Sequence, residues 1–200
     1  MEDGVKILIG TLIAATLAAW PARAGWQAVE TIATYTITGT SGPELYASIG
    51  KRGPTLGEGR VIAHTGFKLT WTRSYEPTPD GGCRLAAAKP RLVITYTLPR
   101  PARPLLPATA ALWKTFIDGV EAHERVHGEQ IKEMVRRIEA ATVGFSVPDD
   151  PRCQRIREAL PAILGPLSQA QRAAARDFDR VEMSDGGAVH RLILSLVNGR

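Results

Sequence analysis

Apolar and polar residues alternate along several segments in the first half of the chain, as they do in β-strands with one buried face. The segments with this pattern, which are rich in β-branched and aromatic residues, are residues 34–38, 67–72 and 92–97. Glycine and proline gather between these segments and predict chain reversals at residues 38–43 and 77–82. We therefore expect residues 25–98 to be mainly β, with one short helix at residues 44–49.

A different spacing dominates the second half, where apolar residues recur three and four positions apart. This spacing predicts one long helix over residues 109–142, with Thr109 as its N-cap and Gly144 at its end. The apolar face of this helix consists of Trp113, Phe116, Ile117, Val120, Ile131, Met134, Val135 and Ile138. The proline-rich residues 99–107 join the two halves, and we expect them to be neither helix nor central strand because proline lacks a backbone N–H.

Two shorter helical patterns follow the long helix. They cover residues 153–164 and 167–178, and we expect Gly165 and Pro166 to separate them. Residues 185–187 favour a turn, and residues 190–197 are compatible with either a final strand or a final helix.

The composition favours one globular domain, because 200 residues with 44% hydrophobic and 22% charged side chains suit a single core. We expect residues 25–200 to form this domain, with residues 108–200 mainly α. The fold class is then α+β, with an antiparallel sheet packed on the long helix and further helices at the C-terminal end. The net charge is +5, and the Lys and Arg residues are scattered along the chain without forming a run. We therefore expect no nucleic-acid partner.

The first 24 residues predict an export signal. Residues 7–20 are almost wholly apolar, but this stretch is shorter than the ~20 residues that span a bilayer as a helix. Ala22, Arg23 and Ala24 form the small-x-small pattern of a signal-peptidase site, which places cleavage before Gly25. We therefore expect a periplasmic or secreted protein without stable membrane insertion after cleavage. An uncleaved membrane anchor is the alternative.

Export changes the interpretation of the two cysteines. In an oxidising compartment Cys83 and Cys153 are an even pair without a competing thiol, which predicts one disulfide. Two separate buried thiols are the alternative.

The candidate chemistry lies on the long helix, in the segment His123-Glu124-Arg125-Val126-His127. Residues four apart in a helix share one face, so His123 and His127 can direct two imidazoles at one zinc ion (Zn²⁺). Glu124 then projects beside the metal, where it can act as the general base. A buried pair of hydrogen-bonded histidines is the alternative.

A third protein ligand is required, and the candidates lie near the C-terminus. They are Asp177, Asp179, Glu182, Asp185 and His190. Tyr96 and His190 are candidate hydrogen-bond donors to the oxyanion.

The chain also resembles a bacterial family of unknown function whose members are described as predicted secreted zinc-dependent proteases. The elements that carry the resemblance are Tyr35 to Gly39, Leu45 and Tyr46, Thr65 to Trp71, Cys83, Leu98 and Pro99, Leu112 and Trp113, Phe116, His123 to His127, and Cys153. The resemblance implies a zincin-like protease with His123 and His127 as zinc ligands and Glu124 as the base.

One feature of that family is missing here. Its members carry an aromatic residue and an aspartate followed by a Thr-x-His-Gly segment, whose histidine is the natural third ligand. Phe178 and Asp179 match the first part, but Ser184 or Asp185 stands where the histidine would be. Zinc also accepts carboxylate ligands, so we expect Asp185 to be the third ligand, with Glu182 as second choice.

We therefore predict an exported zinc peptidase that acts on a peptide or protein substrate, which would lie as an added strand along the edge of the sheet. The alternatives are an exported zinc-binding or interaction domain without catalysis, and an envelope scaffold without metal. The oligomeric state does not follow from the sequence.

Overall fold

A computed structural model describes residues 25–199, so the predicted export signal lies outside the described residues. The main sheet has three long strands, β1 (Val29–Ile37), β4 (His64–Pro77) and β5 (Cys83–Pro101), in the order β1-β5-β4. A short strand, β6 (Ser146–Val147), pairs with the beginning of β5. The three predicted strand segments lie within these long strands, apart from the last residue of the first segment, and the α+β class is confirmed.

The sheet is mixed, which corrects the expectation of an antiparallel sheet. β4 and β5 form the antiparallel hairpin that the predicted reversal at residues 77–82 implies, but β1 pairs with β5 in parallel. Between β1 and β4 the chain forms α1 (Gly42–Arg52) and a small hairpin of β2 (Thr55–Leu56) and β3 (Gly59–Arg60). A parallel pair needs a long crossover connection, which here consists of this segment together with β4, because β4 returns the chain to the end of the sheet where β5 begins.

The prolines after residue 98 do not end the central strand, although we expected them to. β5 continues to Pro101, paired with β1 as far as Ile37. The N–H of Ala102 bonds to the carbonyl of Ile37, so alternate nitrogens, including those of Pro99 and Pro101, face the other side of the strand. On that side β4 begins only opposite Thr97, and the missing N–H groups therefore interrupt no ladder.

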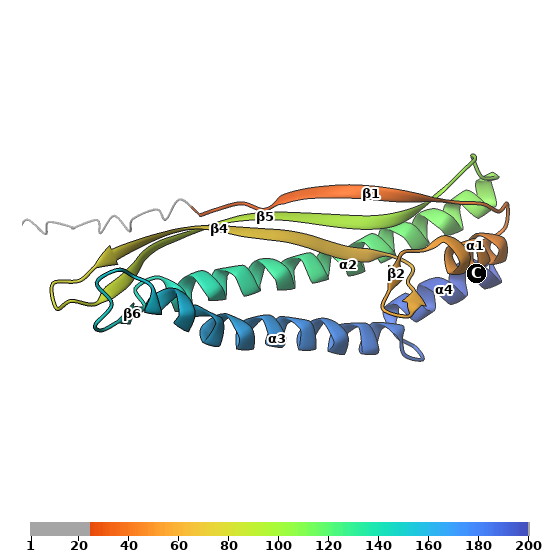
Figure 1. Cartoon of the computed structure of the whole chain (residues 1–200). Coiled ribbons are helices and arrows are strands. Elements are labelled where there is room, and N and C mark those ends of the chain that lie inside the picture. The colour runs from red at the N-terminus through yellow and green to blue at the C-terminus, as the bar shows by residue number, and fades with distance from the viewer. Residues whose placement is uncertain (1–24, 200) are drawn as a thin grey trace, which may run out of the picture.

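Two long helices cover one face of the sheet (Figure 1). α2 (Pro107–Thr142) agrees closely with the predicted helix, and α3 (Arg155–Met183) runs beside it in the opposite direction. α4 (Ala188–Asn198) packs with α1 against the N-terminal part of α2, so the last segment is a helix. Apolar side chains from β5, α2 and α3 form the core between these layers.

α3 is one continuous helix, not the two segments that we expected. It passes through Pro161 and Pro166, whose side chains lie on its exposed side. A proline inside a helix removes one hydrogen bond and bends the axis, and packing of the other face holds the helix together. The helix consequently reaches Met183 instead of ending near Phe178.

The predicted disulfide is confirmed. Cys83 and Cys153 are bonded, with their Cα atoms 5.3 Å apart, and they tie the start of β5 to the loop before α3. A stable cystine indicates an oxidising compartment outside the cytoplasm. Across residues 25–199, none of the helices combines the length and the apolar character needed to cross a membrane.

Candidate metal centre

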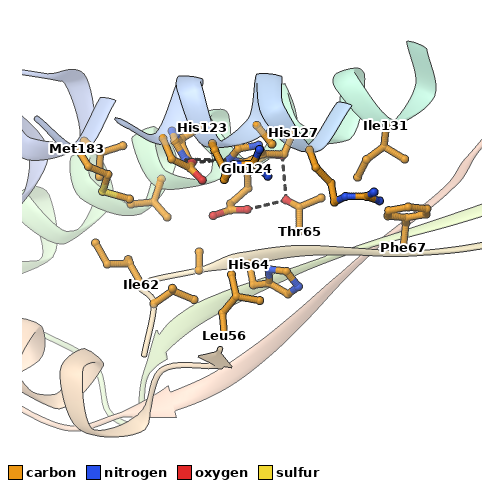
Figure 2. A pocket seen from close by; sticks show the side chains of 18 of the residues that line it. Leu56, Ile62, His64, Thr65, Phe67, His123, Glu124, His127, Ile131 and Met183 are labelled. Carbon is orange, nitrogen blue, oxygen red and sulfur yellow. Dashed lines mark hydrogen bonds and ion pairs between the residues drawn. The ribbon is translucent and has the colours of Figure 1, made fainter. Parts of the chain in front are cut away.

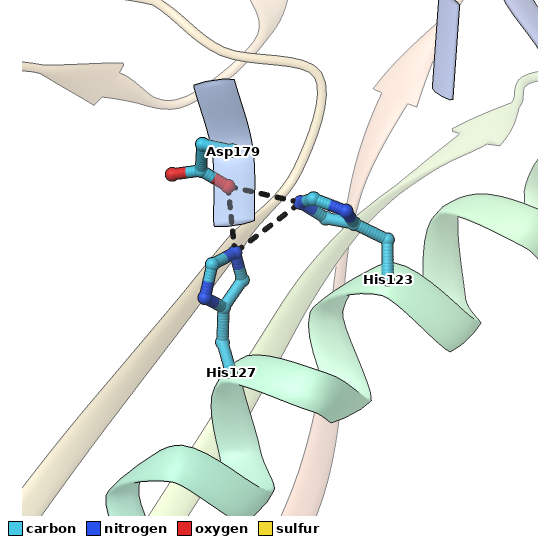
Figure 3. A group of neighbouring side chains, drawn as sticks. All are labelled: His123, His127 and Asp179. Carbon is cyan, nitrogen blue, oxygen red and sulfur yellow. Dashed lines mark hydrogen bonds and ion pairs between the residues drawn. The ribbon is translucent and has the colours of Figure 1, made fainter. Parts of the chain in front are cut away.

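The two histidines of the sequence motif lie one turn apart on the face of α2 that is turned toward α3. The side chain of His123 is 4% exposed and that of His127 is 12% exposed. Both rings therefore occupy positions that apolar residues fill elsewhere on the same helix. Their Nε2 atoms point away from α2 to a common point (Figure 3).

Asp179 on α3 completes this group. Its Oδ1 lies 3.1 Å from His123 Nε2 and 2.8 Å from His127 Nε2, and the two ring nitrogens are 3.2 Å apart. We call His123, His127 and Asp179 the metal-ligand group. It is the one cluster of this kind with metal-ligand geometry within residues 25–199.

The three atoms lie 2.8–3.2 Å apart, which is within hydrogen-bond distance and slightly closer than the ligand atoms around a tetrahedral zinc ion. Asp179 Oδ1 can accept from both rings only if both Nε2 atoms carry hydrogens, and those two N–H groups then crowd each other across 3.2 Å. A tetrahedral zinc ion with bonds of 2.0–2.1 Å separates its ligand atoms by roughly 3.3–3.4 Å. Two imidazoles and one carboxylate are also a donor set that zinc accepts, with a fourth position left for water or substrate.

The structure brings Asp179 to the histidines in place of Asp185, the expected third ligand. The side chain of Asp185 is fully exposed, and its Oδ1 lies 4.0 Å from His190 Nε2. His190 accepts a hydrogen bond from the backbone of Gly186 and also lies outside the metal-ligand group. Asp177, another candidate, pairs with Arg180 on the solvent side of α3.

Asp179 was a candidate in the sequence, but the expected end of the helix at Phe178 concealed its position. A residue after a helix end has no fixed direction, whereas a residue within the last turns of a continuous α3 is held on a definite face. Asp179 shares its face with Ala175 and Met183, four residues before and after it. The four-residue spacing of Ala175, Asp179 and Met183 was the sequence signal that could have placed Asp179 on this face of α3.

Within the metal-ligand group, the imidazoles lower the pKa of Asp179, and Asp179 raises the pKa of His127. Burial alone would raise the pKa of Asp179, but hydrogen bonds and charge from the two imidazoles outweigh it and hold this pKa well below its usual value. Burial opposes a charge on His127 as well, yet the hydrogen bond to Asp179 raises its pKa. The carboxylate therefore stays ionised, as a metal ligand must.

The far side of the His123 ring is held by α3. Phe178 stacks on it with ring centroids 4.7 Å apart. His123 Nδ1 is buried and has no hydrogen-bond partner in the described part of the chain, and Glu182 Oε2 lies 3.9 Å away. A ligating imidazole usually donates its other N–H to a carboxylate or carbonyl. Glu182, the second choice as a ligand, is thus placed to orient His123 instead.

Glu124 is buried beside the group and is held by the sheet. Thr65 on β4 places its Oγ1 2.6 Å from Glu124 Oε2 and 3.0 Å from the Glu124 carbonyl oxygen. Figure 2 shows this hydroxyl beside the carboxylate. Because one oxygen accepts the threonine hydroxyl, Oε1 is the oxygen available for proton transfer. Thr65 was not singled out by the sequence, since its role depends on where β4 meets α2.

Glu124 and the metal-ligand group line a pocket of about 410 Å³ between β4, α2 and α3 (Figure 2). The pocket is mostly apolar, and its other polar side chains are His64, Thr65, Gln171, Arg172 and Arg176. Neither expected oxyanion donor lines it. The Tyr96 hydroxyl donates to Glu30 on the other side of α2, and His190 lies near the end of α3.

A family model described as a bacterial protein of unknown function (DUF922) matches residues 32–187, which include all of these site residues. The chain belongs to this family. The resemblance to a bacterial family of unknown function is thereby confirmed, and the protease description of DUF922 stays a prediction. Neither the curated proteins nor the solved structures contain a match to the chain.

Proposed function

We propose that this DUF922 protein is an exported zinc-dependent peptidase. The observation that carries the proposal is the position of Glu124. Glu124 is 6% exposed, its carboxylate is held by Thr65, and it is adjacent in the chain to His123 of the metal-ligand group, in the pocket of about 410 Å³. The cystine and the predicted export signal of residues 1–24 support a periplasmic or secreted location.

The chain's own residues have distinct tasks in this proposal. His123, His127 and Asp179 would hold zinc, which supplies Lewis acidity toward a carbonyl and acidifies water near neutral pH. Glu124 Oε1 accepts the proton of the attacking water and passes it to the leaving amine. Thr65 keeps the carboxylate in one position through both transfers, and the mostly apolar lining of the pocket leaves Glu124 buried.

The edge of the sheet offers a place for the substrate. β4 is an outer strand of the sheet, and Thr65, near its start, is in hydrogen-bond contact with Glu124. An extended peptide that pairs with this edge gains main-chain hydrogen bonds and brings one of its carbonyls to the metal-ligand group.

The test compares two glutamates of the same helix. Glu124→Gln keeps the side-chain shape but cannot accept a proton, so we expect turnover to fall about 10²-fold or more while zinc content and fold remain. Glu133→Gln is the matched control, because Glu133 is exposed and pairs only with Arg136. Elemental analysis measures the zinc content, and a broad peptide library measures hydrolysis.

The outcomes separate the alternatives. Wild-type turnover in the Glu124→Gln variant would remove Glu124 from the mechanism. A protein that binds one zinc per chain but cleaves no peptide would be a metal-binding or interaction domain, and one that takes up no zinc would be a scaffold.

A further inference from the structure

α3 arranges four side chains in order along the pocket. Asp179 stands at the metal-ligand group, Met183 lies one turn after it, and Arg176 and Arg172 lie one and two turns before it. At 1.5 Å per residue, the two arginines are roughly 4.5 and 10.5 Å along the helix axis from Asp179. The two directions away from the metal-ligand group therefore differ in charge.

The end of the pocket on the Met183 side is apolar. α2 runs opposite to α3, so Val120, one turn before His123, lies at this end, and Figure 2 shows Ile62 on the same side, with Leu56 across the pocket from Glu124. Leu56 is 55% exposed and Met183 is 44% exposed, which leaves apolar surface for a ligand to cover.

The other end combines cations with an apolar floor. Phe67 and Ile131 lie there, on the opposite side of the histidines from Met183 (Figure 2). Arg172 and Arg176 line the same part of the pocket, and neither has an ion-pair partner among residues 25–199.

The nearby acidic side chains do not neutralise these arginines. Asp177 pairs with Arg180, Glu133 with Arg136, and Glu129 with Lys132. The guanidinium groups of Arg172 and Arg176 are thus two neighbouring sets of N–H donors that can bind an acceptor on a ligand.

We propose that the substrate is a peptide with a carboxylate on one side of the scissile bond and a bulky apolar side chain on the other. This inference rests on the peptidase function proposed above. The carboxylate binds Arg172 and Arg176, and the apolar side chain enters the space lined by Val120, Met183 and Ile62. A planar guanidinium binds a carboxylate through two parallel, charge-assisted hydrogen bonds, which are stronger than its hydrogen bonds to a neutral group. The carboxylate is supplied by an acidic side chain or by a free C-terminus.

The first experiment measures kcat/KM for a peptide series in which single positions carry Glu, Gln or Lys and the C-terminus is either free or amidated. We expect a preference of roughly tenfold for the carboxylate peptides, since exposed charge-assisted pairs are partly screened. The preferred peptides show whether the carboxylate belongs to a side chain or to the C-terminus. An equal rate for acidic and neutral peptides would overturn the inference but leave the peptidase function intact.

Substitutions of Arg172 and Arg176 test whether these residues cause the preference for carboxylate peptides. Arg172→Gln combined with Arg176→Gln should bring the ratio of acidic to neutral kcat/KM close to one. Changing both arginines to Glu should instead favour the Lys peptides. Arg180→Gln is the matched control, because Arg180 is exposed on the same helix but pairs with Asp177 and lies outside the pocket. If the double Gln variant keeps the full preference, these arginines are not the carboxylate site.

Binding provides a readout that does not require turnover. The zinc-loaded Glu124→Gln protein is titrated with the same peptides by calorimetry, and the carboxylate peptides should bind roughly tenfold more tightly than their neutral counterparts. This difference should disappear when Arg172 and Arg176 are also replaced by Gln. Equal affinity for both peptide classes would overturn the inference even if the wild-type protein cleaves none of them.

Discussion

At the scale of single residues, the third ligand decides whether the histidine pair can hold a metal. Two imidazoles four residues apart follow from helix geometry alone, whereas the third donor has to come from a different element. The structure gives this place to Asp179, and the more C-terminal Asp185 faces solvent.

Substitution of these two aspartates tests the assignment. Asp179→Ala should reduce zinc affinity by more than the 10- to 100-fold that the loss of an outer hydrogen-bond partner costs, because it removes a direct ligand. Asp185→Ala should leave the affinity within about twofold of wild type, since its side chain is fully exposed. Competition with a zinc chelator measures both. Strong loss of zinc in the Asp185→Ala protein would restore that residue as a ligand.

Part of the site follows from local sequence, and part does not. His123, Glu124 and His127 lie within one turn, so their mutual placement was predictable. Thr65 and Asp179 approach them from 59 residues before and 52 residues after in the chain. Their positions depend on the register of β4 against β5 and on the continuity of α3, neither of which a short motif encodes.

At the scale of elements, the strongest periodic pattern gave the most accurate prediction. The predicted helix over residues 109–142 differs from α2 by two residues at its start, because its apolar stripe has one period throughout. Prediction failed where packing overrides local preference. The prolines of α3 are tolerated because that helix is anchored on both sides of them, and the parallel pairing of β1 depends on the path between strands.

The close approach of α2 to β5 depends on Gly128. A Cβ atom at this position would lie 2.2 Å from the hydroxyl of Tyr96, whose side chain is buried. We expect Gly128→Ala to destabilise the protein by about 1–3 kcal/mol, as overpacking does. Gly50→Ala on α1 meets no atom within 4 Å and should be neutral or stabilising by up to about 1 kcal/mol. Urea unfolding compares the two, and equal midpoints would show that α2 can move away from β5 at little cost.

The start of α3 depends on one aspartate. Asp150 is 3% exposed and accepts hydrogen bonds from the N–H groups of Gln154, at 2.8 Å, and Ile156, at 2.9 Å. Burial alone would raise the pKa of Asp150, but these backbone donors outweigh it and lower the pKa.

This shift predicts how stability depends on pH. A group whose pKa is lower in the folded state stabilises the fold above its unfolded pKa, about 3.9 for Asp, and loses this effect as the pH falls through the folded value. Asp150→Asn should therefore be less stable than wild type near neutral pH, and the difference should shrink below about pH 4. Thermal unfolding at several pH values measures the difference. A gap that is constant down to pH 2 would show that the charge of Asp150 is not involved.

At the scale of the whole molecule, the cystine and the metal-ligand group lie toward opposite ends of α3. Cys153 precedes the first residue of this helix by two positions, and Asp179 lies 24 residues beyond that start, roughly 36 Å along the axis. The cystine therefore holds the first turns of α3 against β5, together with the apolar cluster of Leu85, Ile156 and Leu160. The metal-ligand group holds the other end of α3 against α2.

This separation predicts that stability and metal binding respond independently to loss of the disulfide. Closing a loop with a sequence separation of 70 should contribute about 4 kcal/mol through chain entropy, so Cys83→Ala combined with Cys153→Ala should lower the free energy of unfolding by about that amount. Zinc affinity of the folded variant should remain within about twofold of wild type, because α2 and α3 still meet around Phe178 and Asp179. Loss of zinc from a variant that is still folded would mean that the cystine sets the position of α3 along its whole length.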